Sequence, residues 1–395
     1  MVGHGGLIGT RMNVLFLSPF FPPNAGQYCR ALAGRGLRVL AIGDQPLHAR
    51  ADPLSGVLCD YEFEPNMSDY AALHAATQRL ISRHGTLHRL DSNGEHWLEF
   101  EGRLRDDFAV PGLSFARTRA LRSKSAMGLI FERAQIAYPK TVSARSKDDT
   151  HRLAFERGFP LVLKPDSGSG AVDTFMIEDQ RSLDAAHERD LSAHVAQPFI
   201  SGQIVTFDGL TDHAGRIVFC TSHAYDNGIM QVRQRELDGH YYSLRDLPAE
   251  LERVGRRAVA AFDIRERFFH LELFALQDGT YTALEMNIRP PGGFTPEMMS
   301  AACDVDIFDL WAAVIAGNSL ADARYTRLYH TAHAGRRANR SYRLSRAELE
   351  RDLGEVLFAV EQVPDAFAAT MGNVAYLLRH PDLSALREAV GMVQA

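Results

Sequence analysis

The fold of this 395-residue chain is decided by residues 269–289, which read FHLELFALQDGTYTALEMNIR. Apolar and polar residues alternate on both sides of the sequence Gln-Asp-Gly-Thr at 277–280. Alternation with a period of two is the pattern of a β-strand, because successive side chains point to opposite faces. An Asp-Gly pair between two alternating runs is typical of a hairpin turn. The stretch therefore predicts two neighbouring strands joined as a hairpin.

Side chains with oxygen donors fall on matching faces of these two expected strands. Glu272 lies on the first strand, and Glu285 and Asn287 lie on the second. Carboxylates in apolar strands are costly to bury without a cation, and carboxylate and amide oxygens are hard ligands that suit Mg²⁺. We therefore predict that Glu272, Glu285 and Asn287 bind Mg²⁺. The alternative is an exposed hairpin face, or salt bridges between these carboxylates and Arg289.

Two further side chains share these faces. Arg289 follows Asn287 by two residues, where its guanidinium can clamp a phosphate or a carboxylate through two parallel hydrogen bonds. His270 shares the face of Glu272, and it is expected either to support the site or contact the substrate, or to pack as an ordinary histidine.

A second motif is the sequence LVLKPDSGSG at 161–170. Glycines after a strand expose backbone N–H groups that can approach a phosphate closely, and a lysine at the end of an apolar strand is costly unless its ammonium meets an anion. The motif is neither a P-loop nor a dinucleotide fingerprint, because the required Lys-Ser/Thr and third glycine are missing. An ordinary hairpin loop is the alternative. The predicted phosphate cradle consists of Lys164, Gly168, Ser169 and Gly170.

Composition excludes several classes of protein. Hydrophobic residues make up 46% of the chain and charged residues 23%, as in folded globular proteins. The net charge of -6 has the wrong sign for nucleic-acid binding. The four cysteines form no C-x-x-C pair, which argues against a zinc ribbon or disulfide framework and favours a reducing cytoplasm. Neither an export signal nor an apolar run of about 18 residues is present, so no membrane partner is expected.

The order of the expected elements predicts an α/β fold followed by an α+β region. An apolar run, a helix and a second apolar run within residues 13–42 open the chain as a βαβ unit. One helix is predicted over 117–135, mostly strands follow to about residue 290, and the last 70 or so residues alternate basic and helical stretches. The expected domains are a parallel α/β domain at 12–115, a second domain at 116–320 with a glycine-loop subdomain at about 140–200, and a C-terminal region at 321–395.

These segments, in this order, resemble the ATP-grasp ligases, a superfamily that includes biotin carboxylase, the carbamoyl phosphate synthase large chain and many carboxylate–amine ligases. The resemblance covers about residues 12–320 and rests on residues 122–124, 161–170 and 197–202 together with the two glutamates, which are 13 residues apart. It implies an ATP-grasp fold preceded by a parallel α/β (pre-ATP-grasp) domain, with the C-terminal region completing the ATP-grasp domain or its lid.

The resemblance also implies ATP as the nucleotide and assigns its contacts. Lys124 and Lys164 would contact the phosphates, and the glycine loop would cover them. The hinge that would hold adenine through backbone groups consists of Gln197, Pro198, Phe199 and Ile200. The family usually has a glutamate where this chain has Gln197, and often an acidic residue where it has Ile204. Asp208 is expected to be either a nucleotide contact or an ordinary turn residue.

The chemistry that the resemblance implies is amide or peptide bond formation through an acyl phosphate, with release of ADP and phosphate. Two Mg²⁺ ions are expected, with Mn²⁺ as a substitute. The partners expected are a small-molecule carboxylate and an amine, such as amino acids, and a homodimer is left open. Arg289 and Lys164 are assigned catalytic roles; Arg233 either joins them, binding the γ-phosphate or a substrate carboxylate, or is a solvated charge.

Two alternatives remain at this point. The first is activation of bicarbonate, as in carboxylases, although nothing in the sequence indicates a carboxylated acceptor such as biotin. The second is a nucleotide-binding module without catalysis, which the departures at Gln197 and Ile204 favour and the intact carboxylate set opposes. A protein kinase is excluded, because neither H-R-D nor D-F-G occurs.

Overall fold

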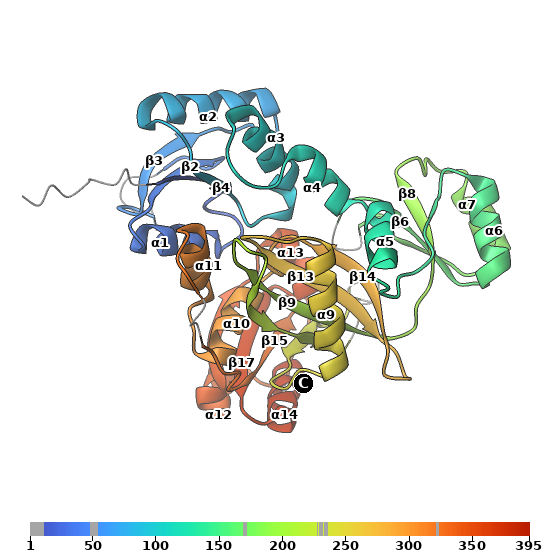
Figure 1. The fold of residues 1–395 in the computed structure, drawn as a ribbon. Coiled ribbons are helices and arrows are strands. Elements are labelled where there is room, and N and C mark those ends of the chain that lie inside the picture. The colour runs from blue at the N-terminus through green and yellow to red at the C-terminus, as the bar shows by residue number, and fades with distance from the viewer. Residues whose placement is uncertain are drawn as a thin grey trace, which may run out of the picture. The chain divides into compact units, whose positions relative to one another are not determined.

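The computed structural model describes residues 12–47, 54–168, 172–226, 228, 232, 236–320 and 324–395. The chain forms two compact units (Figure 1). The first runs to Thr118 and includes Phe308–Ser319, and the second consists of Arg119–Ile307 and Leu320–Ala395. The boundary expected at 115/116 therefore falls at 118/119, and one segment of the region expected at 116–320 packs with the first unit.

The first unit contains a parallel four-stranded sheet in the order β3-β2-β1-β4. This confirms the predicted α/β class. The strands are β1 (Asn13–Leu17), β2 (Arg38–Gly43), β3 (Leu58–Phe63) and β4 (Arg89–Asp91). The helices are α1 (Ala25–Gly34), α2 (Tyr70–His84), η1 (Glu95–Trp97), α3 (Leu98–Phe108) and α11 (Ile307–Ile315), and α4 (Phe115–Arg122) runs across the boundary at 118/119.

Helix α11 belongs to the first unit because of its tryptophan. Trp311 is fully buried, and its ring lies 5.2 Å from the ring of Tyr28 and 6.4 Å from that of Phe16, centroid to centroid. Burying an aromatic side chain of this size removes a large apolar area from water. The core of the first unit therefore depends on a residue almost 200 positions beyond the end of its main segment.

The single helix predicted over 117–135 is wrong, because the chain breaks at Ser123 between α4 and α5 (Lys124–Arg133). Ser123 has extended backbone angles, and its Oγ accepts a hydrogen bond from the N–H of Ala126 at 3.2 Å. The same Oγ donates to Asp166 at 2.7 Å. Serine is among the preferred N-cap residues because its oxygen satisfies a helix N–H group, so Lys124 becomes the first residue of a new helix.

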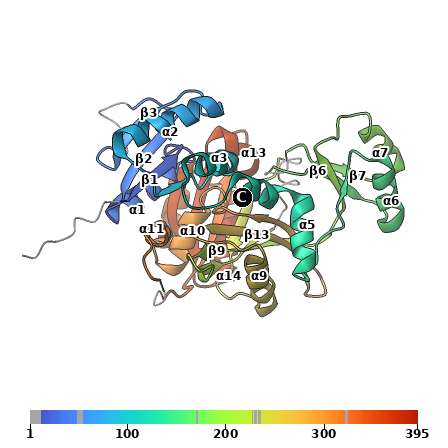
Figure 2. The ribbon, with the colours of Figure 1, turned by 45° about the horizontal axis from the view of Figure 1, so that its top comes forward.

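The predicted glycine-loop subdomain contains an antiparallel sheet in the order β5-β8-β6-β7. Its strands are β5 (Val142–Ser143), β6 (Leu161–Pro165), β7 (Phe175–Ile177) and β8 (His194–Pro198), and its helices are α6 (Lys147–Arg157) and α7 (Gln180–Ala186). Figures 1 and 2 both show α6 and α7 on the side of β6–β8 away from the large sheet described next. Buried side chains such as Leu153, Leu163 and Leu183 form the core between sheet and helices.

The remainder of the second unit is built on a nine-stranded sheet in the order β14-β13-β9-β11-β12-β15-β17-β16, with β10 paired to β9. Its strands are β9 (Gln203–Thr211), β10 (Ile217–Thr221), β11 (His223–Tyr225), β12 (His240–Ser243), β13 (Phe268–Ala275), β14 (Tyr281–Asn287), β15 (His330–Arg336), β16 (Leu357–Gln362) and β17 (Val374–His380). The helical elements of this part are α9 (Ala249–Ala261), α10 (Thr295–Cys303), α12 (Arg346–Leu353), η2 (Gly354–Val356), α13 (Asp365–Met371) and α14 (Leu383–Gln394). The C-terminal region, expected to be basic and helical, thus also supplies three strands of this sheet.

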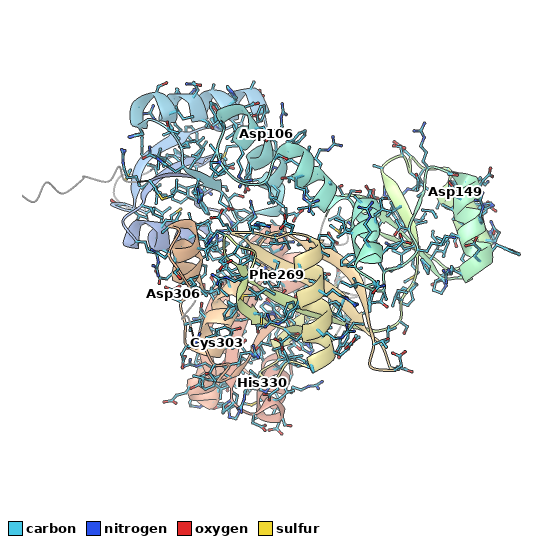
Figure 3. All side chains as sticks on the ribbon, in the orientation of Figure 1. Asp106, Asp149, Phe269, Cys303, Asp306 and His330 are labelled. Atoms are coloured by element: carbon cyan, nitrogen blue, oxygen red, sulfur yellow. The ribbon has the colours of Figure 1, made fainter. Side chains whose placement is uncertain are left out.

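The predicted hairpin is confirmed as β13 and β14. Their register places Glu272 opposite Glu285 and His270 opposite Asn287. A bulge follows Glu272, so that the next pair is Leu273 with Ala283. Phe269, labelled in Figure 3, is fully buried in the core of this part of the molecule. In the described part of the chain, no helix is long and apolar enough to cross a bilayer.

Candidate active site

A cavity of about 670 Å³ opens in the second unit, with walls from both of its sheets. It contains all the predicted site residues that the structure describes: Lys124, Lys164, Gly168, Gln197, Pro198, Phe199, Ile200, Glu272, Glu285, Asn287 and Arg289. The predicted Ser169, Gly170 and Arg233 lie outside the described residues. One part of the cavity, called the charged end below, is defined by Lys124, Lys164, Gly168, Glu272, Glu285 and Asn287.

A carboxylate that the sequence did not single out holds the two lysine-bearing elements together. Asp166 follows β6, and its Oδ1 accepts hydrogen bonds from the backbone N–H and the Oγ of Ser125, both at 2.9 Å. Its backbone oxygen accepts the N–H of Lys124 at 2.8 Å. A carboxylate at the N-terminus of α5 suits the positive end of the helix dipole. The Lys124 ammonium consequently reaches the backbone oxygen of Gly168 at 3.2 Å.

The two lysines at the charged end are buried and close enough to repel each other. Lys164 is 8% exposed and Lys124 is 5% exposed. Burial, followed by the charge of Lys124, lowers the pKa of Lys164 to about 8, although the carboxylates of Glu285 and Glu272 oppose the shift. Two desolvated ammonium groups are costly without an anion between them. The geometry is therefore suited to a polyanion such as a nucleotide phosphate chain.

The carboxylates of β13 and β14 face the same end of the cavity. Glu272 and Glu285 are direct cross-strand partners, and like charges in that position repel unless a cation lies between them. Lys124 approaches Glu285 at 3.8 Å, and Asn287 is 5% exposed. The described residues contain no group of three or more His, Cys, Asp and Glu side chains arranged around a metal. Two carboxylates with one amide still fit Mg²⁺, which keeps water and phosphate ligands in proteins.

Asp208, expected to be a nucleotide contact or a turn residue, is neither. It lies within β9 with no exposed surface. Its Oδ2 lies 2.7 Å from Nδ1 of His223 and also accepts a hydrogen bond from Thr206, and its Oδ1 lies 2.6 Å from Nδ1 of His270. Nε2 of His270 lies 3.1 Å from Oε1 of Glu272. A buried chain of hydrogen bonds therefore leads from Asp208 through His270 to Glu272.

Charge alternates along this chain. Burial would raise the pKa of Asp208, but the positive charge of His270 and the hydrogen bond from His223 lower it to about 2. Burial would lower the pKa of His270, but Asp208 raises it to about 9. The hydrogen bond and charge of His270 in turn lower the pKa of Glu272 in spite of its burial. Glu272 is therefore held as an oriented carboxylate.

The four residues predicted to form an adenine hinge line the cavity, but one of their backbone groups already makes a hydrogen bond within the protein. The N–H of Phe199 donates to the carbonyl oxygen of Pro160 at 3.0 Å, so it is not available to an adenine ring. The Gln197 side chain donates to Oγ1 of Thr141 at 2.7 Å, which uses the amide that replaces the family's glutamate. Ile204 also lines the cavity and presents an apolar surface there.

Sequence reasoning missed the other part of the cavity, called the aromatic end below and defined by Tyr225, Tyr241, His333, Phe367 and Met371. The rings of Tyr225 and Tyr241 stack at 4.9 Å, and those of Tyr241 and His333 stack at 5.2 Å. These residues come from β11, β12, β15 and α13, and β9 separates their strands from the hairpin that carries the carboxylates. No local pattern in the sequence joins four such distant segments. The only local signal near them is the glycine pair at 292–293, which also lines the cavity.

Comparisons with known proteins agree with this architecture. Residues 122–292 match a family model described as an ATP-grasp domain. A curated relative, the L-arginine-specific L-amino acid ligase of Bacillus subtilis, is 23% identical over 245 residues, and the match spans 58% of this chain and 58% of that protein's length.

Solved structures resemble nearly the whole chain. The L-amino acid ligase from Bacillus licheniformis has a TM-score of 0.74 at 16% identity, covering 97% of this chain and 98% of that one. The biotin carboxylase domain of 2-oxoglutarate carboxylase from Hydrogenobacter thermophilus, solved with MgADP and bicarbonate, has a TM-score of 0.71 at 15% identity, covering 95% and 88%. The predicted resemblance is confirmed: residues 122–292 match the ATP-grasp domain, and the chain has the fold of the ATP-grasp ligases.

Proposed function

We propose that this protein is an ATP-dependent carboxylate–amine ligase that forms an amide or peptide bond, with amino acids or related small molecules as substrates. The observation that carries the proposal is the charged end of the cavity, where two buried lysines face two paired glutamates. Buried charges of both signs are costly to maintain without bound partners. ATP phosphates would pair with the lysines, and a divalent cation would pair with the glutamates.

The chain's own residues would act mainly by positioning. Lys124 and Lys164 would bind and neutralise the phosphate chain, which is most of what phosphoryl transfer requires of a protein. Glu272, Glu285 and Asn287 would hold Mg²⁺, whose charge supplies further stabilisation of the phosphate oxygens. Arg289 would orient the substrate carboxylate for in-line attack on the γ-phosphate. The carboxylate oxygen forms the new P–O bond, ADP leaves, and an amine then displaces phosphate from the acyl phosphate.

The guanidinium of Arg289 is suited to this position. Its positive charge helps to lower the pKa of Glu272 and opposes the rise in the pKa of Tyr225, so it acts on residues of both ends of the cavity. Nη1 donates to the carbonyl oxygen of Pro290 at 2.8 Å, which limits where the planar group can point. A substrate carboxylate held there would lie next to the charged end.

The aromatic end favours an organic carboxylate over bicarbonate. Bicarbonate has no apolar part to place against Tyr241, Phe367 and Met371, whereas an amino acid does. A nucleotide-binding module without catalysis would not need the hydrogen-bonded chain that orients Glu272.

Hydroxylamine trapping tests the proposal. The purified protein with ATP, Mg²⁺ and a panel of amino acids should release ADP, and added hydroxylamine should convert the acyl phosphate into a hydroxamate. ADP release that requires bicarbonate and no amino acid would replace the proposal with bicarbonate activation. Amide product formed without any trapped hydroxamate would refute the acyl phosphate.

A further inference from the structure

The aromatic end of the cavity has the composition of a binding site for an uncharged group. Three of its rings lie nearly parallel, with 18° between the planes of Tyr225 and Tyr241 and 14° between those of Tyr241 and His333. Phe367 and Met371 add apolar surface, and a thioether makes favourable contacts with aromatic rings. These rings stack on one another across neighbouring strands, and an aromatic ring packs favourably against the edges of such a stack.

His333 supplies the polar element of this wall. It lines the cavity with 1% of its surface exposed, and within the described part of the chain neither of its ring nitrogens has a side-chain hydrogen-bond partner, while the backbone of Gly239 interacts with the ring. Buried polar atoms of this kind are uncommon and costly. Burial, followed by the charge of His240, lowers the pKa of His333 to about 4. At neutral pH the ring therefore offers one N–H donor and one acceptor.

Asp226, a carboxylate beside the aromatic end, is already paired. Oδ2 of Asp226 lies 2.8 Å from Nε2 of His240 and accepts a hydrogen bond from Arg387 at 3.1 Å. These partners offset its charge, so Asp226 is not available to bind an ammonium group. The apolar surfaces of Phe367 and Met371 at this end favour a ligand group that carries no charge.

The wall is also held in place by close packing. Gly293 has φ of +64°, and a Cβ atom at this position would lie 2.3 Å from Cε of Met371. The positive φ favours glycine here, and the missing side chain leaves room for the end of the Met371 side chain beside the cavity. The hydroxyl of Tyr241 is hydrogen bonded to Oγ1 of Thr295 at 2.9 Å, which fixes the ring edge. Preorganised walls of this kind reduce the entropic cost of binding.

We propose that the aromatic end receives the side chain of the carboxylate substrate, that this substrate is an amino acid whose aromatic ring carries a neutral hydrogen-bonding group, and that His333 forms the hydrogen bond to that group. The proposal rests on the proposed ligase function, because it assumes that the reacting carboxylate lies at Arg289. It names His333 as the residue that determines specificity.

Hydroxamate formation with single amino acids tests the proposal, with hydroxylamine as the common acceptor. Tyrosine and phenylalanine differ by one hydroxyl group, so the ratio of their kcat/KM values isolates the hydrogen bond. We expect tyrosine to exceed phenylalanine about tenfold, and both to exceed glycine, aspartate and arginine. His333→Phe should reduce the tyrosine-to-phenylalanine ratio to near one, and His333→Asn, which keeps a donor and an acceptor, should retain part of it.

A matched control is His151→Phe, because His151 lies on α6 outside the cavity and pairs with Asp184. It should leave the tyrosine-to-phenylalanine ratio unchanged. Thermal melting checks that each variant is folded. The tyrosine-to-phenylalanine ratio of the wild-type protein tests the proposal even if a variant does not fold. Hydroxamates formed equally well from charged or small amino acids, or a ratio that His333→Phe does not alter, would overturn the inference and leave the ligase function intact. The absence of hydroxamate with every amino acid would overturn both.

Discussion

The two ends of the cavity differ in how they are built and in what they can specify. The charged end comes from short motifs at β6, the start of α5 and one hairpin, and its groups suit a ligand common to all ATP-dependent ligases. The aromatic end comes from four separate elements and suits the part of a substrate that varies between enzymes. In the proposed function, different segments of one cavity would therefore carry chemistry and specificity. Substitutions at the charged end should lower kcat/KM for all amino acids by the same factor. Substitutions at the aromatic end should change which amino acids give the highest kcat/KM.

Glu285→Gln should have the largest effect. It removes a negative charge from the predicted Mg²⁺ site without removing volume, so ADP release should fall by about a thousandfold or more for every substrate. ADP release at saturating Mg²⁺ measures this. Glu250→Gln is the matched control, because Glu250 lies on α9 and pairs with the exposed Arg253. Wild-type turnover in Glu285→Gln would remove the metal site from the charged end.

Lys164→Ala should follow. Loss of one preorganised charge partner costs about 2–4 kcal/mol in comparable sites, so kcat/KM for ATP should fall by roughly 30- to 1000-fold. The decrease should be the same with tyrosine and with leucine as the carboxylate. Lys147→Ala, which removes an exposed lysine that pairs with Asp184, should leave ATP kinetics unchanged. A decrease that depends on the amino acid would contradict the division between the two ends.

Arg289→Lys should separate ATP binding from ligation. Lysine retains the positive charge but not the planar pair of donors that holds a carboxylate. ATP affinity should be retained, whereas amide and hydroxamate formation should fall by about ten- to a hundredfold. Nucleotide binding measured alongside product formation tests this. Equal losses in both quantities would assign Arg289 to the phosphates and thus to the charged end alone.

Asp208→Asn should have the smallest of these effects, because Asp208 acts through His270. The neutral amide should weaken the orientation of Glu272 and raise the Mg²⁺ concentration that gives half-maximal activity by roughly three- to tenfold. A Mg²⁺ titration at saturating ATP measures the shift, which a general loss of stability would not produce. Asp278→Asn, in the exposed hairpin turn, provides the control. An unchanged Mg²⁺ requirement would show that Asp208 stabilises the fold but does not orient Glu272.

The sequence predicted what depends on neighbours along the chain. The hairpin follows from alternation and the turn at 277–280, although the pairing of Glu272 with Glu285 also needs the bulge after Glu272. Lys164 follows from its place at the end of an apolar strand. Long-range partners set the rest. The break at Ser123 depends on Asp166, 43 residues away, and Asp208 finds His270 62 residues away. Local sequence patterns do not predict such contacts, because the fold of the sheets decides which distant side chains come close together.

The burial of Trp311 in the first unit has a consequence for synthesis of the chain. Residues Asn13–Leu17 and Tyr28 leave the ribosome early, but the ring that covers them follows only after Arg119–Ile307 has been made. The first unit should therefore remain incomplete and expose apolar surface while most of the second is synthesised. A fragment ending at Thr118 would lack this ring, and we expect it to recover its native stability only when a peptide spanning Ile307–Ser319 is supplied.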